Sequence, residues 1–353
     1  MIDLTKKYCF THSDGKEVYL ATLKNANGTT VSISNYGAII SSFKIKTSYG
    51  LNDIVLGFDR VEDYLSAKYL ASYPYFGAAI GRYANRIANG TFYLDSRKIE
   101  LSKNSGANQL HGGFQGFDRK VWTILPSEKG SFLLEYKSAD GEEGYPGNLT
   151  VTIHFQLTDS DELLYEYIAT TDQSTPVNLT HHSYFNLDNG SGTIGTHRVQ
   201  LNADHFLEQD PSYCATGRTL TVKNTPYDFT TLKQVNSNWI PGEGYDQSFV
   251  INKNEDQHKM NDLHLAAAVL SAQSAIKLEV FTNAPIVHFY TGKYITAIEG
   301  KQGEVYQPFS GLCFETQEYP NAVNIPSFPG TILRPGETYR FKTMYRISQL
   351  PEK

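Results

Sequence analysis

Cysteine is scarce in this chain, with Cys9, Cys214 and Cys313 the three in 353 residues. Their odd number and wide spacing match neither a disulfide framework nor the paired ligands of a zinc site. No apolar run approaches the ~18 residues that span a bilayer, and the first residues lack the apolar centre of a signal peptide. We therefore expect a protein of the reducing cytoplasm that does not associate with membranes.

Basic residues are also too few for a nucleic-acid-binding surface. The chain has 31 Lys and Arg against 37 Asp and Glu, a net charge of −6, whereas nucleic acid calls for a clustered basic face. Tryptophan and methionine are rare, at 2 and 3, but Tyr and Phe are abundant, at 24 and 19. Aromatic residues favour strands, and their faces suit contact with sugar rings.

Alternating apolar and polar residues form the dominant pattern, and helical segments are few. Residues 339–347 alternate between two faces, and 163–168 and 278–281 have strand composition. Asn27-Gly28 favours a tight primed hairpin turn before the strand at 31–34. Residues 266–270 are expected to be a strand entering a hairpin, and 59–71 to hold a short helix. The sequence thus predicts an all-β fold of stacked antiparallel sheets, with residues 1–353 in a single domain.

Five polar clusters interrupt this alternation, and the most informative contains Glu315. Glu315 follows an apolar stretch that ends in Cys313 and Phe314. Apolar surroundings disfavour the charged form of a carboxyl group and bring it toward proton transfer at neutral pH. The alternative is a strand-end glutamate that accepts hydrogen bonds from nearby backbone.

The cluster at 178–187 contains the adjacent histidines His181 and His182. In an extended segment they point to opposite faces, so one faces a cavity and the other the opposite side. The alternative is a packed, hydrogen-bonded histidine pair. Metal ligation is disfavoured, because no cysteine or carboxylate lies nearby at ligand spacing.

The other three clusters each allow a binding or a structural role. Residues 81–90 hold two Arg and two Asn, which suit pairs of sugar hydroxyls or the bracing of a loop. His111 precedes two glycines, where the backbone can bend sharply. Asp246 lies between aromatic residues, in a site or in an Asx-turn. No P-loop, dinucleotide-binding fingerprint or nucleophile elbow is present.

Taken together, the five clusters resemble the aldose 1-epimerase (galactose mutarotase) family. The matching segments, in the family's order between residues 81 and 324, are GRYANRIANG, NQLHGG, NLTHHSYFNL, GYDQSF and FETQEYPNAVN. The resemblance implies a large antiparallel β-sandwich of the galactose mutarotase-like supersandwich type, with few short helices and a site in a concave cleft.

The resemblance also implies roles for individual residues. His182 is the expected general acid and Glu315 the base. The residues expected to hold the sugar's hydroxyls and ring oxygen are Asn85, Arg86, His111 and Asp246. His288 stands in the substrate site where many family members have glutamine, which leaves the sugar preference open.

The activity so implied is the interconversion of α and β anomers of free aldoses, such as glucose, galactose or maltose, with neither cofactor nor metal. Two alternatives remain at this point. A glycoside hydrolase would pair Glu315 with Asp246 or Glu318. A non-catalytic carbohydrate-binding or regulatory protein would keep the fold without turnover. A hexose 6-phosphate is a less favoured substrate, and the sequence gives no oligomeric state.

Overall fold

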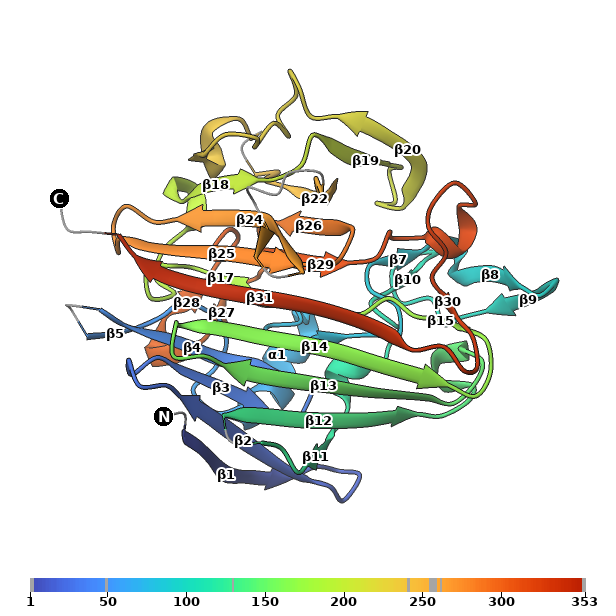
Figure 1. The fold of residues 1–353 in the computed structure, drawn as a ribbon, viewed down its shortest axis with the longest axis horizontal. Coiled ribbons are helices and arrows are strands. Elements are labelled where there is room, and N and C mark those ends of the chain that lie inside the picture. Colours follow the sequence, from blue (N-terminus) through green and yellow to red (C-terminus); the bar gives the residue numbers. More distant parts are fainter. Residues whose placement is uncertain are drawn as a thin grey trace.

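The computed structural model describes residues 3–47, 50–128, 130–239, 242–253, 259–260 and 262–350. Antiparallel strands dominate this structure, and two large sheets form its centre (Figure 1). The larger sheet contains, in spatial order, β11 (Thr123–Leu125), β12 (Ser131–Ser138), β13 (Leu149–Leu157), β14 (Glu162–Thr171), β31 (Tyr339–Gln349), β25 (Ile276–Thr282), β24 (Leu263–Leu270), β18 (Arg198–Leu201) and β21 (Lys233–Gln234), with β23 (Lys259–Met260) beside β24. The second contains β17 (Tyr184–Phe185), β29 (Leu312–Gln317), β26 (Ile286–Tyr290), β22 (Asp246–Val250), β19 (His205–Gln209) and β20 (Ala215–Thr221).

A third sheet and five short ladders surround these two. The third sheet contains β1 (Asp3–Thr11), β2 (Glu17–Lys24), β3 (Thr30–Ser34), β4 (Ile40–Thr47) and β5 (Gly50–Asp53). The ladders pair β6 (Ala79–Ile80) with β16 (Thr180–His181), β7 (Arg86–Ile87) with β10 (Gln109–Leu110), β8 (Thr91–Leu94) with β9 (Arg97–Glu100), β15 (Thr175–Pro176) with β30 (Ile332–Leu333), and β27 (Ile298–Glu299) with β28 (Val305–Tyr306).

Helical structure in the described residues is short. It comprises the α-helix α1 (Ala67–Ser72) and the single-turn elements η1 (Val61–Leu65), η2 (Ala88–Gly90), η3 (Phe117–Arg119), η4 (Glu142–Gly144), η5 (Ile194–Thr196), η6 (Val235–Ser237), η8 (Lys301–Gly303) and η9 (Ala322–Asn324). The helix predicted within 59–71 is therefore confirmed as η1 and α1. The Ser66 hydroxyl accepts from the Tyr69 backbone N–H and caps the start of α1.

The two large sheets pack face to face, as the alternating patterns predict. The rings of Phe185 on β17 and Tyr345 on β31 lie 5.0 Å apart, edge to face. The hydroxyls of Thr316 on β29 and Thr343 on β31 form a hydrogen bond of 2.6 Å across the same interface. The main hydrophobic core gathers residues from Ala21 to Ile347 between and around these sheets. The predicted all-β sandwich and the strand at 266–270 are both confirmed.

Two local expectations need correction. The hairpin around Asn27-Gly28 forms, but its loop runs over residues 25–29 because the side chain of Asn25 accepts from the Thr29 N–H at 2.9 Å. Gly28 alone of the dipeptide has a positive φ, of 90°, so the turn is not the predicted primed type. On β31, the alternation groups Met344 with Arg340, Lys342 and Arg346, yet Met344 is buried against Leu263 and Phe281.

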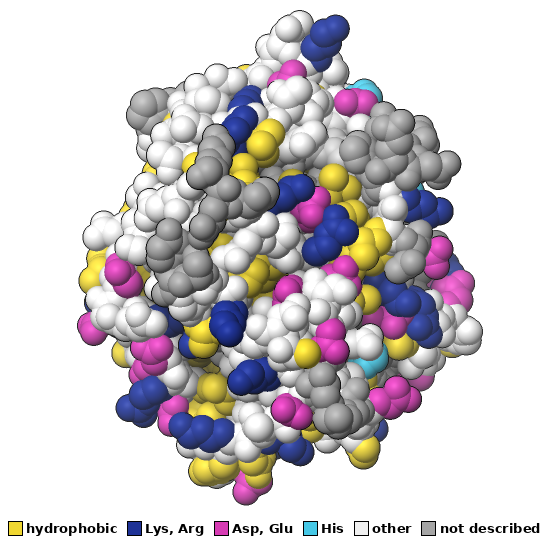
Figure 2. All heavy atoms as spheres, turned by 60° about the vertical axis from the view of Figure 1, so that its left-hand side comes forward, with side chains coloured by type: hydrophobic (Ala, Val, Ile, Leu, Met, Phe, Trp, Pro, Cys, Tyr) yellow, Lys and Arg dark blue, Asp and Glu magenta, His cyan; other side chains and the backbone are white. Residues whose placement is uncertain are grey.

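Charged side chains of both signs are intermixed on the face of the molecule shown in Figure 2. Among the described residues, no helix is long and apolar enough to cross a membrane.

Candidate active site

A cleft of about 540 Å³ contains every residue that the sequence singled out as a site residue. This volume lies within the range of about 300–1,000 Å³ that is typical of small-molecule sites. The predicted residues on its wall are Asn85, Arg86, His111, His182, Asp246, His288 and Glu315. Segments far apart in the sequence thus meet at one place.

Strand register places three of these side chains together. Glu315 on β29 lies directly opposite His288 on β26, so their side chains share one face of the sheet. Asp246 on β22 is two residues before Ser248, the cross-strand partner of His288, and therefore has the same orientation. Their neighbours Phe314 and Phe289 point the other way and stack in the core at 5.5 Å.

The adjacent histidines divide between the two faces, as predicted. His181 points into the core, where its Nε2 lies 3.0 Å from the carbonyl oxygen of Ala38 and its Nδ1 lies 3.2 Å from the Ser183 hydroxyl. His182 points into the cleft and is 3% exposed. Both are buried, but His182 alone borders the space in which a ligand would bind.

Left-handed backbone positions bring Asn85 and His111 to the cleft. Their φ angles are 60° and 52°, a region that asparagine and histidine adopt more readily than most residues. His111 follows β10, which pairs with β7 next to Asn85. Gly112 continues the bend with a φ of 84°, and a Cβ there would collide with the carbonyl oxygen of Gly81.

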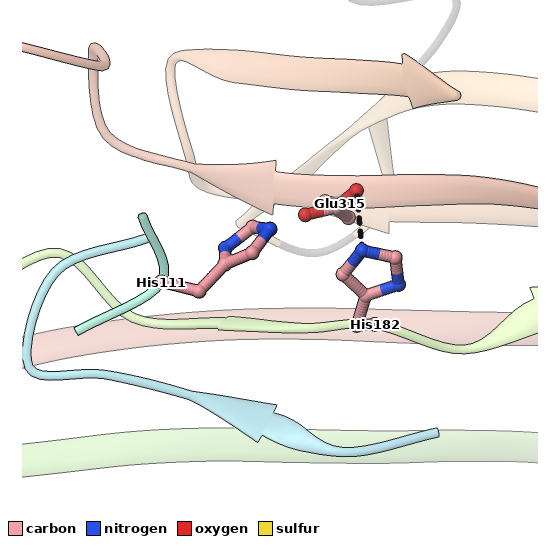
Figure 3. Close-up of side chains that lie close together, drawn as sticks. All are labelled: His111, His182 and Glu315. Atoms are coloured by element: carbon pink, nitrogen blue, oxygen red, sulfur yellow. Dashed lines mark ion pairs between the residues drawn. The ribbon is translucent and has the colours of Figure 1, made fainter. Parts of the chain in front are cut away.

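His182 and Glu315 form a buried histidine–carboxyl pair in the cleft. Figure 3 shows both side chains and that of His111 directed into the same space. The distance from His182 Nε2 to Glu315 Oε1 is 3.4 Å, and His182 Nδ1 lies 3.5 Å from the Cys313 sulfur. The second carboxylate oxygen, Oε2, is buried and makes no hydrogen bond with any described residue. It is therefore available for a hydrogen bond with a ligand.

Burial shifts the protonation of this pair in opposite directions. It raises the pKa of Glu315 from 4.5 to about 7, with the nearby charge of Asp246 adding to the rise and nearby positive charge, including that of Arg86, opposing it. Burial also lowers the pKa of His182 from 6.5 to about 3. The free pair therefore holds one proton, on Glu315, between about pH 3 and pH 7.

Burial and neighbouring groups also shift the pKa values of His111 and Asp246. Burial lowers the pKa of His111 well below its ordinary value, and the neighbouring His182 and Arg86 add to the effect. Burial alone would raise the pKa of Asp246, but the hydrogen bond from His288 and the nearby positive charges outweigh it and leave that pKa lowered. His288 Nε2 lies 2.9 Å from Asp246 Oδ1.

His111, His182 and Glu315 also have the spacing of a metal site, since their ligand atoms lie within 4.8 Å of one another. Two histidines and a glutamate form a known zinc-binding set. However, His111 Nδ1 accepts the Asn85 backbone N–H at 3.2 Å. The neutral ring then carries its proton on Nε2, which suits a hydrogen-bond donor better than a metal ligand.

Several cleft residues escaped prediction because nothing in their local sequence marks them. Tyr75, at a φ of 60° in the turn after α1, stacks on His182 with ring centroids 5.8 Å apart and meets His111 edge-on at 4.9 Å. Arg119 reaches the cleft from η3, with its guanidinium 3.9 Å from the centre of the Tyr73 ring. The Tyr73-Pro74-Tyr75 turn was the one available signal, and it is compatible with ordinary packing.

Arg82 belongs to the same polar cluster as Arg86 but has a structural role. It is 2% exposed and points away from the cleft. Its guanidinium donates to the carbonyl oxygens of Ser138, Ala139 and Pro146 at 2.7–3.0 Å. Arg82 therefore has the structural role that the sequence left open for this cluster, whereas Arg86 lies on the wall of the cleft.

Comparison with known proteins gives this geometry a family. The family model described as aldose 1-epimerase matches residues 19–346, nearly the whole chain. This chain belongs to the aldose 1-epimerase family. The matched region contains all seven predicted site residues, with the acid–base pair of His182 and Glu315.

Individual family members cover almost all of the chain. A galactose mutarotase from Sus scrofa is 41% identical over 325 residues, which are 90% of this chain and 91% of the relative. An aldose 1-epimerase from Escherichia coli is 35% identical over 343 residues, 95% and 96% of the two chains. The crystal structure of an aldose epimerase homologue from C. elegans superposes with a TM-score of 0.86 at 28% identity, covering 98% of this chain and 100% of that one.

Proposed function

We propose that this family member is an enzyme that interconverts the α and β anomers of free aldoses. The observation that carries this function is the buried pair of His182 and Glu315 at 3.4 Å on the wall of a cleft of sugar-binding size. The unpartnered Oε2 of Glu315 is available to accept a hydrogen bond from a sugar hydroxyl. The reaction uses proton transfers alone and requires no cofactor.

Ring opening proceeds by two proton transfers. Glu315 takes the proton of the C1 hydroxyl, and His182 donates a proton to the ring oxygen O5. The C1–O5 bond breaks, C1 becomes an aldehyde carbon, and the former ring oxygen becomes a hydroxyl. Rotation about C1–C2 presents the other face of the carbonyl, and reclosure reverses both transfers. Groups in such roles each contribute about 10²–10⁴-fold to the rate.

The protonation of the free pair suits this exchange. One proton is shared between two groups whose neutral forms are favoured by burial. With the sugar bound, transfer of that proton to His182 creates the acid and the base at once, with no exchange with solvent. Return of the sugar's proton through the reverse steps regenerates the starting pair.

The remaining cleft residues hold the sugar. Arg86 and His111 are assigned as donors to the ring and hydroxyl oxygens, and Asp246 as an acceptor from hydroxyls. Asn85 and His288 complete this wall. Phe114 and Tyr294, each more than half exposed at the cleft, leave space for a second sugar ring. Glucose and galactose are the first candidate substrates, and maltose is the next.

Polarimetry on freshly dissolved α-D-glucose, α-D-galactose and β-maltose tests this function. The full-length protein should accelerate relaxation to the unchanged equilibrium rotation, and the rates rank the sugars. Relaxation at the buffer rate for all three would overturn the assignment in favour of sugar binding without turnover. A drift of maltose to a new final rotation would instead identify a glycoside hydrolase.

We also place this enzyme in the cytoplasm. The three cysteines are free, and Cys214 and Cys313 are buried. Free thiols are typical of a reducing compartment. Microscopy of a fluorescent fusion in the source cells tests this location, and a signal confined to a membrane-enclosed oxidising compartment would contradict it.

A further inference from the structure

Asn85 contacts two histidines of the cleft through two different donor groups. Its backbone N–H donates to His111 Nδ1 at 3.2 Å. Its side-chain amide nitrogen, Nδ2, lies 3.4 Å from His288 Nδ1. The left-handed backbone of Asn85 lets the main chain and the side chain of one residue reach both rings.

The orientation of the Asn85 amide follows from its third contact. Its carbonyl oxygen, Oδ1, accepts the backbone N–H of Arg86 at 2.8 Å, so Nδ2 is the atom that faces His288. A backbone N–H and an amide NH₂ can only donate. The Ser248 hydroxyl, 2.8 Å from His288 Nδ1, can donate or accept and therefore adapts to either form of the ring. The two obligate donors that constrain these histidines both belong to Asn85.

An obligate donor at Nδ1 requires that this nitrogen has no proton. The neutral ring must then carry its proton on Nε2. For His288 the result agrees with its other contact, because Nε2 faces the acceptor Asp246 Oδ1 at 2.9 Å. For His111, the ring is directed toward Glu315 and His182 (Figure 3), so Nε2–H becomes a donor to the cleft.

We propose that Asn85 is a positioning residue that fixes the proton-bearing nitrogen of both His111 and His288. His111 then presents a permanent hydrogen-bond donor to the ligand, and His288 holds the Asp246 carboxylate in place through Nε2–H. The value of this arrangement for turnover rests on the proposed function: a donor fixed in advance does not have to reorganise when charge develops on the ring oxygen.

Histidine ¹⁵N NMR on the full-length protein tests this role without any sugar. Long-range ¹H–¹⁵N correlations distinguish the two neutral ring forms and the doubly protonated ring. In the native protein at pH 7.5, both His111 and His288 should carry their proton on Nε2, with assignment from the variants His111→Gln and His288→Gln. A proton on Nδ1 of His111, or of His288, would overturn the inference.

The variant Asn85→Asp separates the two contacts. A carboxylate cannot donate to Nδ1 and favours a proton there, so a proton should appear on His288 Nδ1. His111 should keep its proton on Nε2, because its donor is the main chain. An unchanged His288, or a change in both rings, would refute the assignment.

Asn85→Gly provides a second test that avoids a new buried charge. Glycine retains the left-handed backbone and the N–H toward His111. Ser248 is then free to accept from His288 Nδ1, so a proton should again appear on that nitrogen while His111 remains unchanged. A His288 Nδ1 that stays unprotonated would count against the role of the amide. If the native protein shows no mutarotation, the proposed function fails, yet these spectra still decide the role of Asn85.

Discussion

The variant Glu315→Gln should become more stable than the native protein as the pH rises, because glutamine never ionises. It should also lack the proposed catalytic base. Glu315 is 1% exposed, and one of its oxygens has no hydrogen-bond partner among the described residues. Its ionised form is therefore poorly compensated. Glutamine has nearly the same shape but never ionises, so Glu315→Gln isolates the cost of the charge.

The size of the effect follows from the raised pKa of Glu315. Burial moves this pKa from 4.5 to about 7 in the folded protein. Below about pH 4.5 the group is neutral in both states and costs nothing. Between about pH 4.5 and pH 7 the unfolded chain ionises while the folded one does not, so folding stability falls by about 1.36 kcal/mol per pH unit, up to about 3.4 kcal/mol above pH 7. Between pH 5 and pH 8 the change is about 2.5 kcal/mol.

Urea denaturation of the native protein and of Glu315→Gln at pH 5 and pH 8 measures this quantity. The difference in unfolding free energy between the two proteins should be about 2.5 kcal/mol more in favour of the variant at pH 8 than at pH 5. Any effect of the introduced glutamine amide on the unfolding free energy that does not depend on pH cancels when the two pH values are compared. Glu299→Gln, at the exposed end of β27, controls for the loss of one negative charge. A difference that stays constant from pH 5 to pH 8 would refute the assignment of a buried, protonated Glu315.

Three further predictions test the cleft and its support. The value of kcat/KM for mutarotation should be level from pH 5 to about pH 7 and fall tenfold per unit above it, since the pair loses its single proton at the raised pKa of Glu315; a rise above pH 7 would contradict this. His182→Asn should lower kcat by about 10²–10⁴-fold at an unchanged melting temperature, and near-native turnover would exclude His182 as the acid. Arg82→Lys should lower the unfolding free energy by about 2–4 kcal/mol with KM unchanged, because lysine cannot reproduce the buried fork of hydrogen bonds. Arg86→Lys is the matched variant, for which KM should rise with stability unchanged; the reverse pattern would exchange the two roles.

Much of the fold could be predicted because period-two alternation is a direct record of which face of a strand is buried. Residues 339–347 alternate in the sequence and form β31 at the centre of the large sheet. At two places a side-chain contact determined a local structure that the pattern did not predict. Met344 is buried by Leu263 and Phe281 although it alternates with the apolar face. The side chain of Asn25 accepts from the Thr29 N–H, so the hairpin loop is longer than Asn27-Gly28 alone predicts.

The site divides in the same way. Alternation also separated His181 from His182, but it could not say which one faces the cleft; the family resemblance selected His182, and the structure places it there. Residue type and local pattern did not distinguish buried Arg82 from Arg86, four residues away, and the family resemblance alone selected Arg86. The sequence did not identify Tyr75 and Arg119 as cleft residues, because they reach the cleft through a turn and a short helix whose positions depend on the whole sandwich.

The sequence by itself determined the residue types needed for proton transfer, their order, and the alternation that builds the sheets. The tertiary structure alone decided the charge states and distances. Glu315 meets His182 at 3.4 Å because strand β29 and the segment after β16 approach in space, across 133 positions of sequence. Burial in that enclosed place, a property of the assembled fold, brings the pKa of the carboxyl group to the range where proton exchange at neutral pH is possible.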